Sequence, residues 1–121
     1  MGKRILIVDD EKVWAKMLAM SLEHEGYQIE VAFDAMQATR QAFQLKPDLI
    51  LMDIMMPAGG GLEALKNIRA NAKTFSIPVI ILSAIQDKKT IKAAEELGVS
   101  GYFPKSVDMD YLVEKIKEIF K

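Results

Sequence analysis

Residues 47–57 read Pro-Asp-Leu-Ile-Leu-Met-Asp-Ile-Met-Met-Pro, a short apolar run that ends on one carboxylate, Asp53. Four other short runs are rich in apolar or β-branched residues: residues 5–8, 29–31, 79–82 and, more weakly, 101–103. Continuous apolar runs of this length are typical of strands that are covered on both faces. The sequence therefore predicts five strands, most of them buried.

Stretches with helical spacing lie between and after these runs: residues 12–25, 34–45, 62–69, 91–97 and 111–119. The apolar residues expected on the buried side of the first helix are Val13, Met17, Leu18 and Leu22. Asp34 is a candidate N-cap for the second helix. Strand followed by helix, five times over, predicts a parallel sheet with right-handed crossovers and helices on both faces.

The composition is that of one globular domain. The chain has 121 residues, half of them apolar and 27% charged, which leaves no room for a second domain of ordinary size. There is no cysteine, which excludes disulfides and thiol chemistry. Sixteen basic and seventeen acidic residues do not favour nucleic-acid binding, and no apolar run is long enough to enter a membrane. We expect a cytoplasmic protein.

Polar side chains follow four of the five predicted strands. Asp9 and Asp10 follow the first, Asp53 ends the third, Ser83 ends the fourth and Lys105 follows the fifth. Ligands of open α/β sheets bind outside the carboxyl ends of the strands. If these four strands are neighbours, their polar residues meet at one edge of the sheet.

Such a cluster would hold more negative than positive charge. Two carboxylates at about 4 Å repel each other by several kcal/mol at an intermediate dielectric, and Lys105 alone cannot balance three of them. Either one carboxyl keeps its proton or a hard cation binds among them. Oxygen ligands suit Mg²⁺, and a metal, an ammonium and a hydroxyl together can stabilise a transferring phosphoryl group. A carboxylate can serve as the nucleophile.

Four segments carry a family resemblance: residues 5–11, residues 47–57 with Gly61, residues 78–84 and residues 98–105. In this order and spacing the chain resembles the response-regulator receiver domains of two-component signalling, including the single-domain chemotaxis regulators. The resemblance covers essentially all 121 residues. It implies a single receiver domain over residues 1–121, with a flavodoxin-like, doubly wound (βα)5 three-layer sandwich. The five-stranded parallel sheet would have the order 2-1-3-4-5.

The resemblance also implies a phosphoacceptor and a metal site. Asp53 would take a phosphoryl group from a phosphohistidine on a sensor kinase or phosphotransfer protein. Asp10 would bind Mg²⁺ (or Mn²⁺) directly and Asp9 directly or through water, with Asp53 itself and the backbone carbonyl of Met55 as further ligands. The chain would catalyse its own phosphorylation and dephosphorylation.

Other positions would stabilise the phosphoryl group or respond to it. By the same resemblance Lys105 would pair with the group, and the backbone N–H of Ala84 would donate to it. The hydroxyl of Ser83 would join on activation, and Tyr102 would turn inward as Ser83 moves. The surface formed by the fourth helix, fifth strand and fifth helix would then bind a downstream protein. This surface would then be an element with two states, and the local change of charge at Asp53 would shift the balance between them.

Two features set the chain apart from the family pattern. The family has a proline on a cis bond after the lysine, whereas Ser106 follows Lys105 here, and a cis bond before a non-proline residue costs about 3 kcal/mol. A trans bond is therefore favoured, which leaves the direction of the lysine open. Residues 59–61 are all glycine and predict a loop.

Met55 and Ile85 flank the site, and we expect them to shield the acyl phosphate from water.

Three other functions remain open. A phosphatase of the haloacid-dehalogenase-like kind would need a nucleophile and a second aspartate two residues apart after the first strand, but Asp9 and Asp10 are adjacent. A flavodoxin-like cofactor binder would need a phosphate loop after the first strand, where the acidic residues would repel it. A receiver-like interaction module that is not phosphorylated is the main alternative. No output domain follows the last predicted helix, which favours a stand-alone receiver over a domain excised from a longer regulator.

Overall fold

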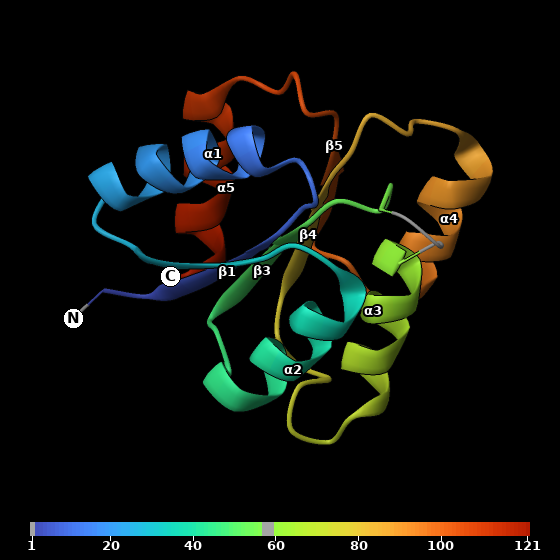
Figure 1. Cartoon of the computed structure of the whole chain (residues 1–121). Helices are drawn as coiled ribbons and strands as arrows, with labels where there is room; N and C mark the ends of the chain where they lie inside the picture. Colours follow the sequence, from blue (N-terminus) through green and yellow to red (C-terminus); the bar gives the residue numbers. More distant parts are fainter. Residues whose placement is uncertain (1, 57–59) are drawn as a thin grey trace.

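The computed structural model describes residues 2–56 and 60–121. Strands and helices alternate along the chain (Figure 1). They are β1 (Arg4–Val8), α1 (Lys12–His24), β2 (Gln28–Ala32), α2 (Ala35–Leu45), β3 (Leu49–Met52), α3 (Gly60–Ala70), β4 (Val79–Leu82), α4 (Lys88–Glu96), β5 (Gly101–Phe103) and α5 (Met109–Ile119). The five predicted strands and five predicted helices are all present.

All strands are parallel, and the sheet order is β2-β1-β3-β4-β5. In register, Val8 lies beside Met52, and Met52 lies beside Ile81. The ends of β1, β3 and β4 are therefore level with one another, and β5 forms an edge of the sheet. This order confirms the predicted fold and places the strand-end residues side by side.

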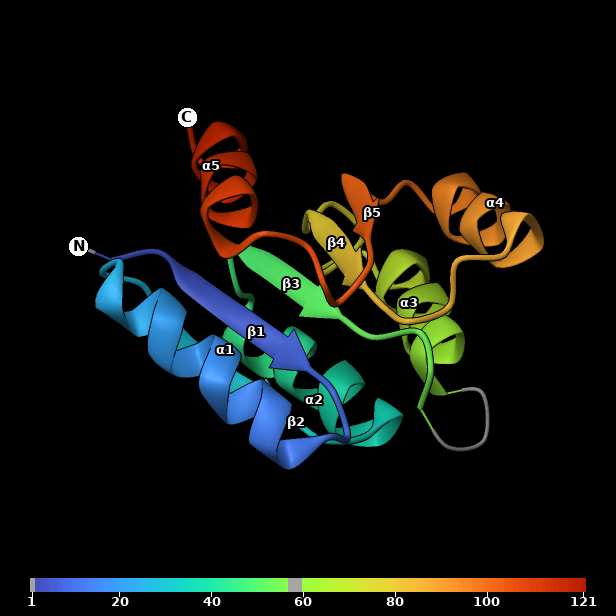
Figure 2. The ribbon, with the colours of Figure 1, turned by 90° about the horizontal axis from the view of Figure 1, so that it is seen from above.

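Helices cover both faces of the sheet in three layers (Figure 2). Helices α1 and α5 pack on one face, where Ile5 and Ile7 point, and α2, α3 and α4 pack on the other, where Leu6 and Val8 point. Alternate residues of a strand face opposite sides, so β1 needs apolar residues at every position. Burying each of these side chains stabilises the fold by about 1.5–3 kcal/mol.

Aspartates begin three of the helices. Asp34 accepts a hydrogen bond from the N–H of Gln37 at 2.8 Å, which confirms it as the N-cap of α2. Asp87 and Asp108 cap α4 and α5 in the same way. Each cap satisfies an N–H that has no partner inside its helix and is worth about 1 kcal/mol.

The prediction for the buried face of α1 was partly wrong. Leu18 and Leu22 are buried, but Val13 is 75% exposed and Met17 is 62% exposed. Ala15 completes the buried stripe instead. At 100° per residue the positions of Val13 and Met17 lie opposite that of Ala15, so they form a second apolar stripe that faces away from the sheet.

The glycine-rich stretch also differs from its prediction. Gly60 and Gly61 are the first residues of α3 rather than loop residues, and both are buried. A Cβ at Gly61 would lie 2.6 Å from the carbonyl oxygen of Ile54, so only glycine fits this close approach. Gly59 and the rest of residues 57–59 lie outside the described residues.

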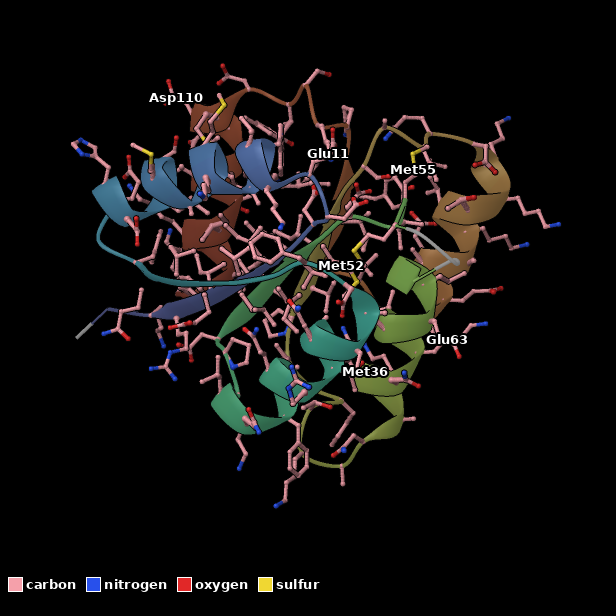
Figure 3. All side chains as sticks on the ribbon, in the orientation of Figure 1. Glu11, Met36, Met52, Met55, Glu63 and Asp110 are labelled. Atoms are coloured by element: carbon pink, nitrogen blue, oxygen red, sulfur yellow. The ribbon has the colours of Figure 1, made fainter. Side chains whose placement is uncertain are left out.

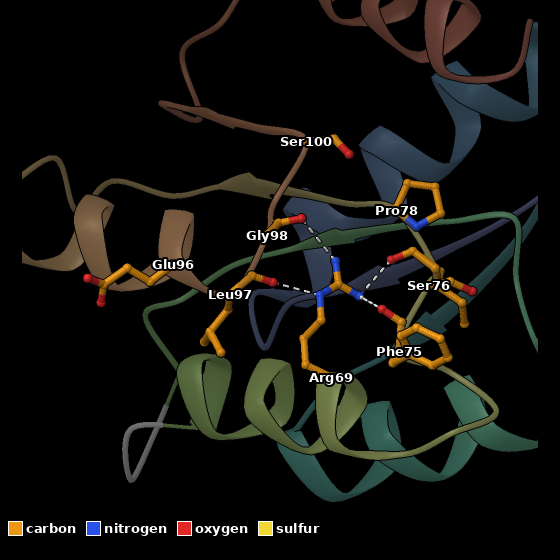
Figure 4. A pocket seen from close by; sticks show the side chains of 9 residues that line it. Arg69, Phe75, Ser76, Pro78, Glu96, Leu97, Gly98 and Ser100 are labelled. Atoms are coloured by element: carbon orange, nitrogen blue, oxygen red, sulfur yellow. Dashed lines mark hydrogen bonds between the residues drawn. The ribbon is translucent and has the colours of Figure 1, made fainter.

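Arg69, near the end of α3, ties together the loops at the amino ends of β4 and β5 (Figure 4). Its guanidinium donates to the backbone carbonyls of Phe75, Ile77, Leu97 and Gly98, at distances from 2.6 to 3.2 Å. A hollow of about 450 Å³ opens beside it. Because four carbonyls already occupy the guanidinium, we read this arrangement as a structural anchor for the end of α4.

Candidate functional site

The sheet ladder extends one residue past the strand ends and fixes the backbone of the site. The N–H of Asp53 donates to the carbonyl of Val8 at 2.9 Å, and that of Ser83 donates to Phe103 at 3.0 Å. The N–H of Asp9 is held by the neighbouring strand in the same way. Asp9, Asp53 and Ser83 are only 1%, 4% and 0% exposed, respectively. Rigid strands therefore carry three of the predicted site residues into a buried position.

The carboxylates of Asp9 and Asp53 are held alike. Oδ1 of Asp9 accepts the N–H of Glu11, and Oδ1 of Asp53 accepts the N–H of Met55, both at 2.8 Å. Aspartate makes this local bond readily, to the backbone two residues further on. Each carboxylate thus has one oxygen fixed by the backbone, while Oδ2 of each faces Lys105.

Lys105 reaches both buried carboxylates. Its Nζ lies 2.8 Å from Oδ2 of Asp9 and 3.0 Å from Oδ2 of Asp53, and it also forms an ion pair with Glu11. Every described peptide bond is trans, including the one between Lys105 and Ser106. The trans bond that Ser106 favours therefore still directs the ammonium to Asp53.

Asp10 adds a third carboxylate at the solvent side. Ligand oxygens of Asp9, Asp10 and Asp53 all lie within 4.8 Å of one another. They border an open hollow of about 520 Å³ whose lining includes Asp10, Asp53 and Lys105. Oδ2 of Asp9 is buried, and its close partner is the Lys105 ammonium. A carboxylate oxygen has more than one lone pair, so this all-oxygen set of donors fits a hard divalent cation such as Mg²⁺.

Burial and nearby charges shift the pKa values of Asp9 and Lys105. Burial raises the pKa of Asp9, with the charge of Asp53 adding to the rise, while Lys105 and the N–H of Glu11 oppose it. Burial alone would lower the pKa of Lys105, but Asp9, Glu11 and Asp53 together raise it above its usual value. Lys105 therefore stays charged at any physiological pH.

Ser83 and Tyr102 meet through the loop after β4. The hydroxyl of Tyr102 donates to the carbonyl of Ile85 at 2.6 Å, and the N–H of Ile85 donates to Oγ of Ser83 at 3.2 Å. Gln86 closes the turn by donating to the carbonyl of Ser83. A hydroxyl that accepts a bond keeps its own proton to donate, so Ser83 retains a donor at the site.

Residues 5–117 match the sequence family described as the response regulator receiver domain. The chain belongs to this family. It is 35% identical over 120 residues to the transcriptional regulatory protein CrdR of Helicobacter pylori, covering 99% of this chain and 56% of CrdR. It is 34% identical over 118 residues to the response regulator ArlR of Staphylococcus saprophyticus, covering 98% and 52% of the two chains. The receiver thus spans about half the length of these relatives.

A solved structure shows the same fold. It is a CheY-like response regulator receiver domain protein from Methanospirillum hungatei, with a TM-score of 0.88 and 30% identity. The match covers 98% of this chain and 93% of that one. Likeness over the full length agrees with the flavodoxin-like strand order found in this receiver.

The structure brings most of the predicted residues of the receiver together. Asp10, Asp53, Met55, Ala84 and Lys105 all line the hollow. The side chain of Met55 is 55% exposed there. The use of the Met55 carbonyl and the Ala84 N–H as ligands stays a prediction.

The remaining predicted residues lie behind the hollow or beside it. Asp9 and Ser83 are buried beneath it, while Ile85 and Tyr102 are half-buried and pack against the cluster under α3 and α4. Figure 3 shows Glu11 on this edge of the molecule near Met55. No role was predicted for Glu11, although its position directly after two site aspartates could have indicated one.

Among the helices of residues 2–56 and 60–121, none has the length and apolar character needed to span a membrane.

Proposed function

We propose that this receiver takes a phosphoryl group onto Oδ2 of Asp53 from a phosphohistidine of a sensor kinase or phosphotransfer protein. One observation carries the proposal: Oδ2 of this buried carboxylate faces the Lys105 ammonium at 3.0 Å, while Oδ1 is held by the Met55 N–H. The backbone bond fixes the carboxylate, so one oxygen is presented to the hollow. Fixing a nucleophile in this way removes part of the entropic cost of the reaction.

The chemistry follows from the charges around Asp53. Oδ2 would attack phosphorus as the bond to the donor's histidine nitrogen breaks, and Lys105 would stabilise the negative charge on the phosphoryl oxygens. Ser83 would donate its free hydroxyl proton, and the N–H of Ala84 would provide a second donor. Mg²⁺ (or Mn²⁺), held by Asp9, Asp10 and Asp53 with the Met55 carbonyl, would neutralise charge on the transferring group.

The output of the reaction would be a changed protein surface. A phosphoryl group that attracts Ser83 would pull on the loop that Tyr102 holds, because Ile85 bonds to both residues. This loop leads into α4, so the α4, β5 and α5 surface is the proposed contact for a downstream protein. We infer a single receiver domain over residues 1–121 that acts in the cytoplasm, where a kinase could reach it.

Met55 and Ile85 are proposed to slow the loss of the phosphoryl group. The exposed side chain of Met55 lines the hollow, and Ile85 lies on the loop after β4. Apolar side chains at these places would hinder the attacking water. The substitution Ile85→Gln should then shorten the lifetime of the phosphorylated protein, and an unchanged lifetime would contradict the shielding role.

Intact-mass measurement tests the proposal directly. The protein is incubated with phosphoramidate and Mg²⁺, and we expect the mass of one phosphoryl group to be gained and then lost after the phosphoramidate is removed by desalting into buffer that contains Mg²⁺. Asp53→Asn should abolish the gain. Asp110→Asn is the matched control, since Asp110 is exposed at the start of α5 (Figure 3). If the wild type gains no mass, the unphosphorylated interaction module becomes the better explanation.

A further inference from the structure

Trp14 lies in the first turn of α1, and its ring faces the amine of Lys105. The Nζ atom is 4.7 Å from the centroid of the ring. An ammonium within about 6 Å of an aromatic face is attracted by the ring quadrupole, most strongly by tryptophan. The side chain of Lys105 is only 15% exposed, so water weakens this attraction little. We propose that Trp14 is a positioning residue that holds the Lys105 ammonium beside Asp53.

Lys105 benefits from such a residue because its long, flexible stem does not by itself hold the ammonium in one position. It follows β5, the short edge strand, and its ammonium is a compact charge on a stem with about 2 kcal/mol of rotamer entropy. Glu11, at the solvent side, attracts it outward from the two buried aspartates. The rigid indole ring of Trp14 occupies one side of the ammonium and reduces the positions it can take. Trp14 is itself held in place by the core under α1 and α5.

The contact between the uncharged ring of Trp14 and the Lys105 ammonium would persist during phosphoryl transfer. Asp9 and Asp53 are the residues whose oxygens a metal ion and a phosphoryl group would occupy, so their hold on Lys105 would change during the reaction. The ring of Trp14 carries no charge and takes no part in that exchange. It would keep Lys105 at the site throughout. This consequence rests on the proposed phosphoryl transfer, whereas the contact between ring and ammonium does not.

The contact itself can be tested without metal or phosphoryl donor. Trp14 is the single tryptophan of the chain, so all indole fluorescence comes from it. Lys105→Met removes the ammonium and keeps an unbranched side chain, and we expect a changed intensity or emission maximum. Lys73→Met is the matched control, because Lys73 lies over the ring of Phe43 instead. Identical spectra of the wild type and Lys105→Met would overturn the proposal.

The positioning role is tested by the initial rate of phosphorylation with phosphoramidate and Mg²⁺. Trp14→Leu should be slower by about threefold to tenfold, as expected for the loss of a partly shielded contact of this type. Trp14→Phe should recover most of the rate because it restores an aromatic face. Phe43→Leu, on α2, removes the ring under Lys73 and should leave the rate unchanged.

Two outcomes of the rate experiment would contradict the positioning role: Trp14→Leu reacting at the wild-type rate, or Trp14→Phe reacting as slowly as Trp14→Leu. Circular dichroism must show that the compared variants are folded. If Trp14→Leu fails to fold, Trp14→Met, which also lacks an aromatic face, takes its place in the rate comparison, and the emission of Lys105→Met still tests the contact. If the wild type itself gains no phosphoryl group, the proposed function fails, but the fluorescence comparison still tests the contact.

Discussion

The hydroxyl of Tyr102 on β5 donates a 2.6 Å hydrogen bond to the backbone carbonyl of Ile85, in the loop that follows β4. The same residue, Ile85, donates its N–H to Oγ of Ser83. One loop residue therefore connects a half-buried phenol at the sheet edge to a fully buried hydroxyl at the site. A shift of Ser83 cannot leave the bond to Tyr102 unaffected unless the loop deforms.

Tyr102→Phe should loosen this loop without disturbing the rest of the fold. Losing one hydrogen bond of this kind costs about 1 kcal/mol. We expect faster amide hydrogen exchange at Ile85 and at its neighbours before α4. Tyr111→Phe is the control, since the ring of Tyr111 packs edge-on against Phe103 and is 45% exposed. Equal exchange in the two variants would mean that the bond does not order the loop.

The same phenol should make stability depend on pH at the alkaline end. Burial raises the pKa of Tyr102 above its usual value. The hydrogen bond with Ser83 opposes this rise in part, and the charges of Asp87 and Asp53 add smaller increases. A raised pKa means that the folded state favours the neutral phenol more than the unfolded state does. This stability is fully present below pH 10 and is lost as the pH rises through the folded-state pKa. The unfolding free energy of the wild type should therefore fall more than that of Tyr102→Phe between about pH 9 and pH 11.

Gly61 should not tolerate a side chain. A Cβ there would collide with the backbone carbonyl oxygen of Asp53 and lie 2.6 Å from that of Ile54, and neither oxygen can move freely. We expect Gly61→Ala to lower the unfolding free energy by about 1–3 kcal/mol and to shift the amide resonance of Asp53. At Gly60 the nearest atom is the methyl carbon of Ala35 at 3.2 Å. Gly60→Ala, the neighbouring control, should change stability by less than about 1 kcal/mol.

The fold and the main site residues could be predicted because each depends on a local signal. A strand of four or five apolar residues can bury all of its side chains only where both faces of the sheet are covered. The polar residue that follows such a strand then lies at the end of the strand. Asp53 and Ser83 needed no more than this. The phase of α1 was harder, because Val13 and Met17 form an apolar stripe as regular as the one that is buried.

The contacts of Lys105 with Glu11 and Trp14 could not be derived in this way. They depend on how the chain enters α1, which brings Glu11 and Trp14 over the end of β5, nearly a hundred residues away in sequence. No periodicity in the sequence indicates that the start of α1 lies over the end of β5. The direction of the Lys105 side chain was also left open by the sequence, and only the structure shows that the ammonium reaches Asp53 with a trans bond before Ser106.

Arg69→Met should destabilise the fold although the site is at the other edge of the sheet. The change keeps the apolar stem but removes hydrogen bonds to four carbonyls, including those of Leu97 and Gly98 after α4. Hydrogen bonds from a charged donor contribute about 1.5–3 kcal/mol each, but water can replace some of them here, so we expect a loss of about 2–4 kcal/mol in urea unfolding. Arg40→Met, on the exposed side of α2, should stay within about 0.5 kcal/mol.

Asp10→Asn should separate metal binding from folding. Asp10 is the exposed member of the carboxylate cluster, so losing its charge removes a proposed metal ligand and relieves repulsion from Asp9 and Asp53. We expect the apparent Kd for Mg²⁺ to rise more than about tenfold, while the metal-free protein melts at the same temperature or slightly higher. Thermal unfolding in EDTA and across a Mg²⁺ titration measures both, because a ligand that binds only the folded state raises Tm. Asp110→Asn should behave as the wild type, and an unchanged Mg²⁺ response in Asp10→Asn would exclude this residue as a ligand.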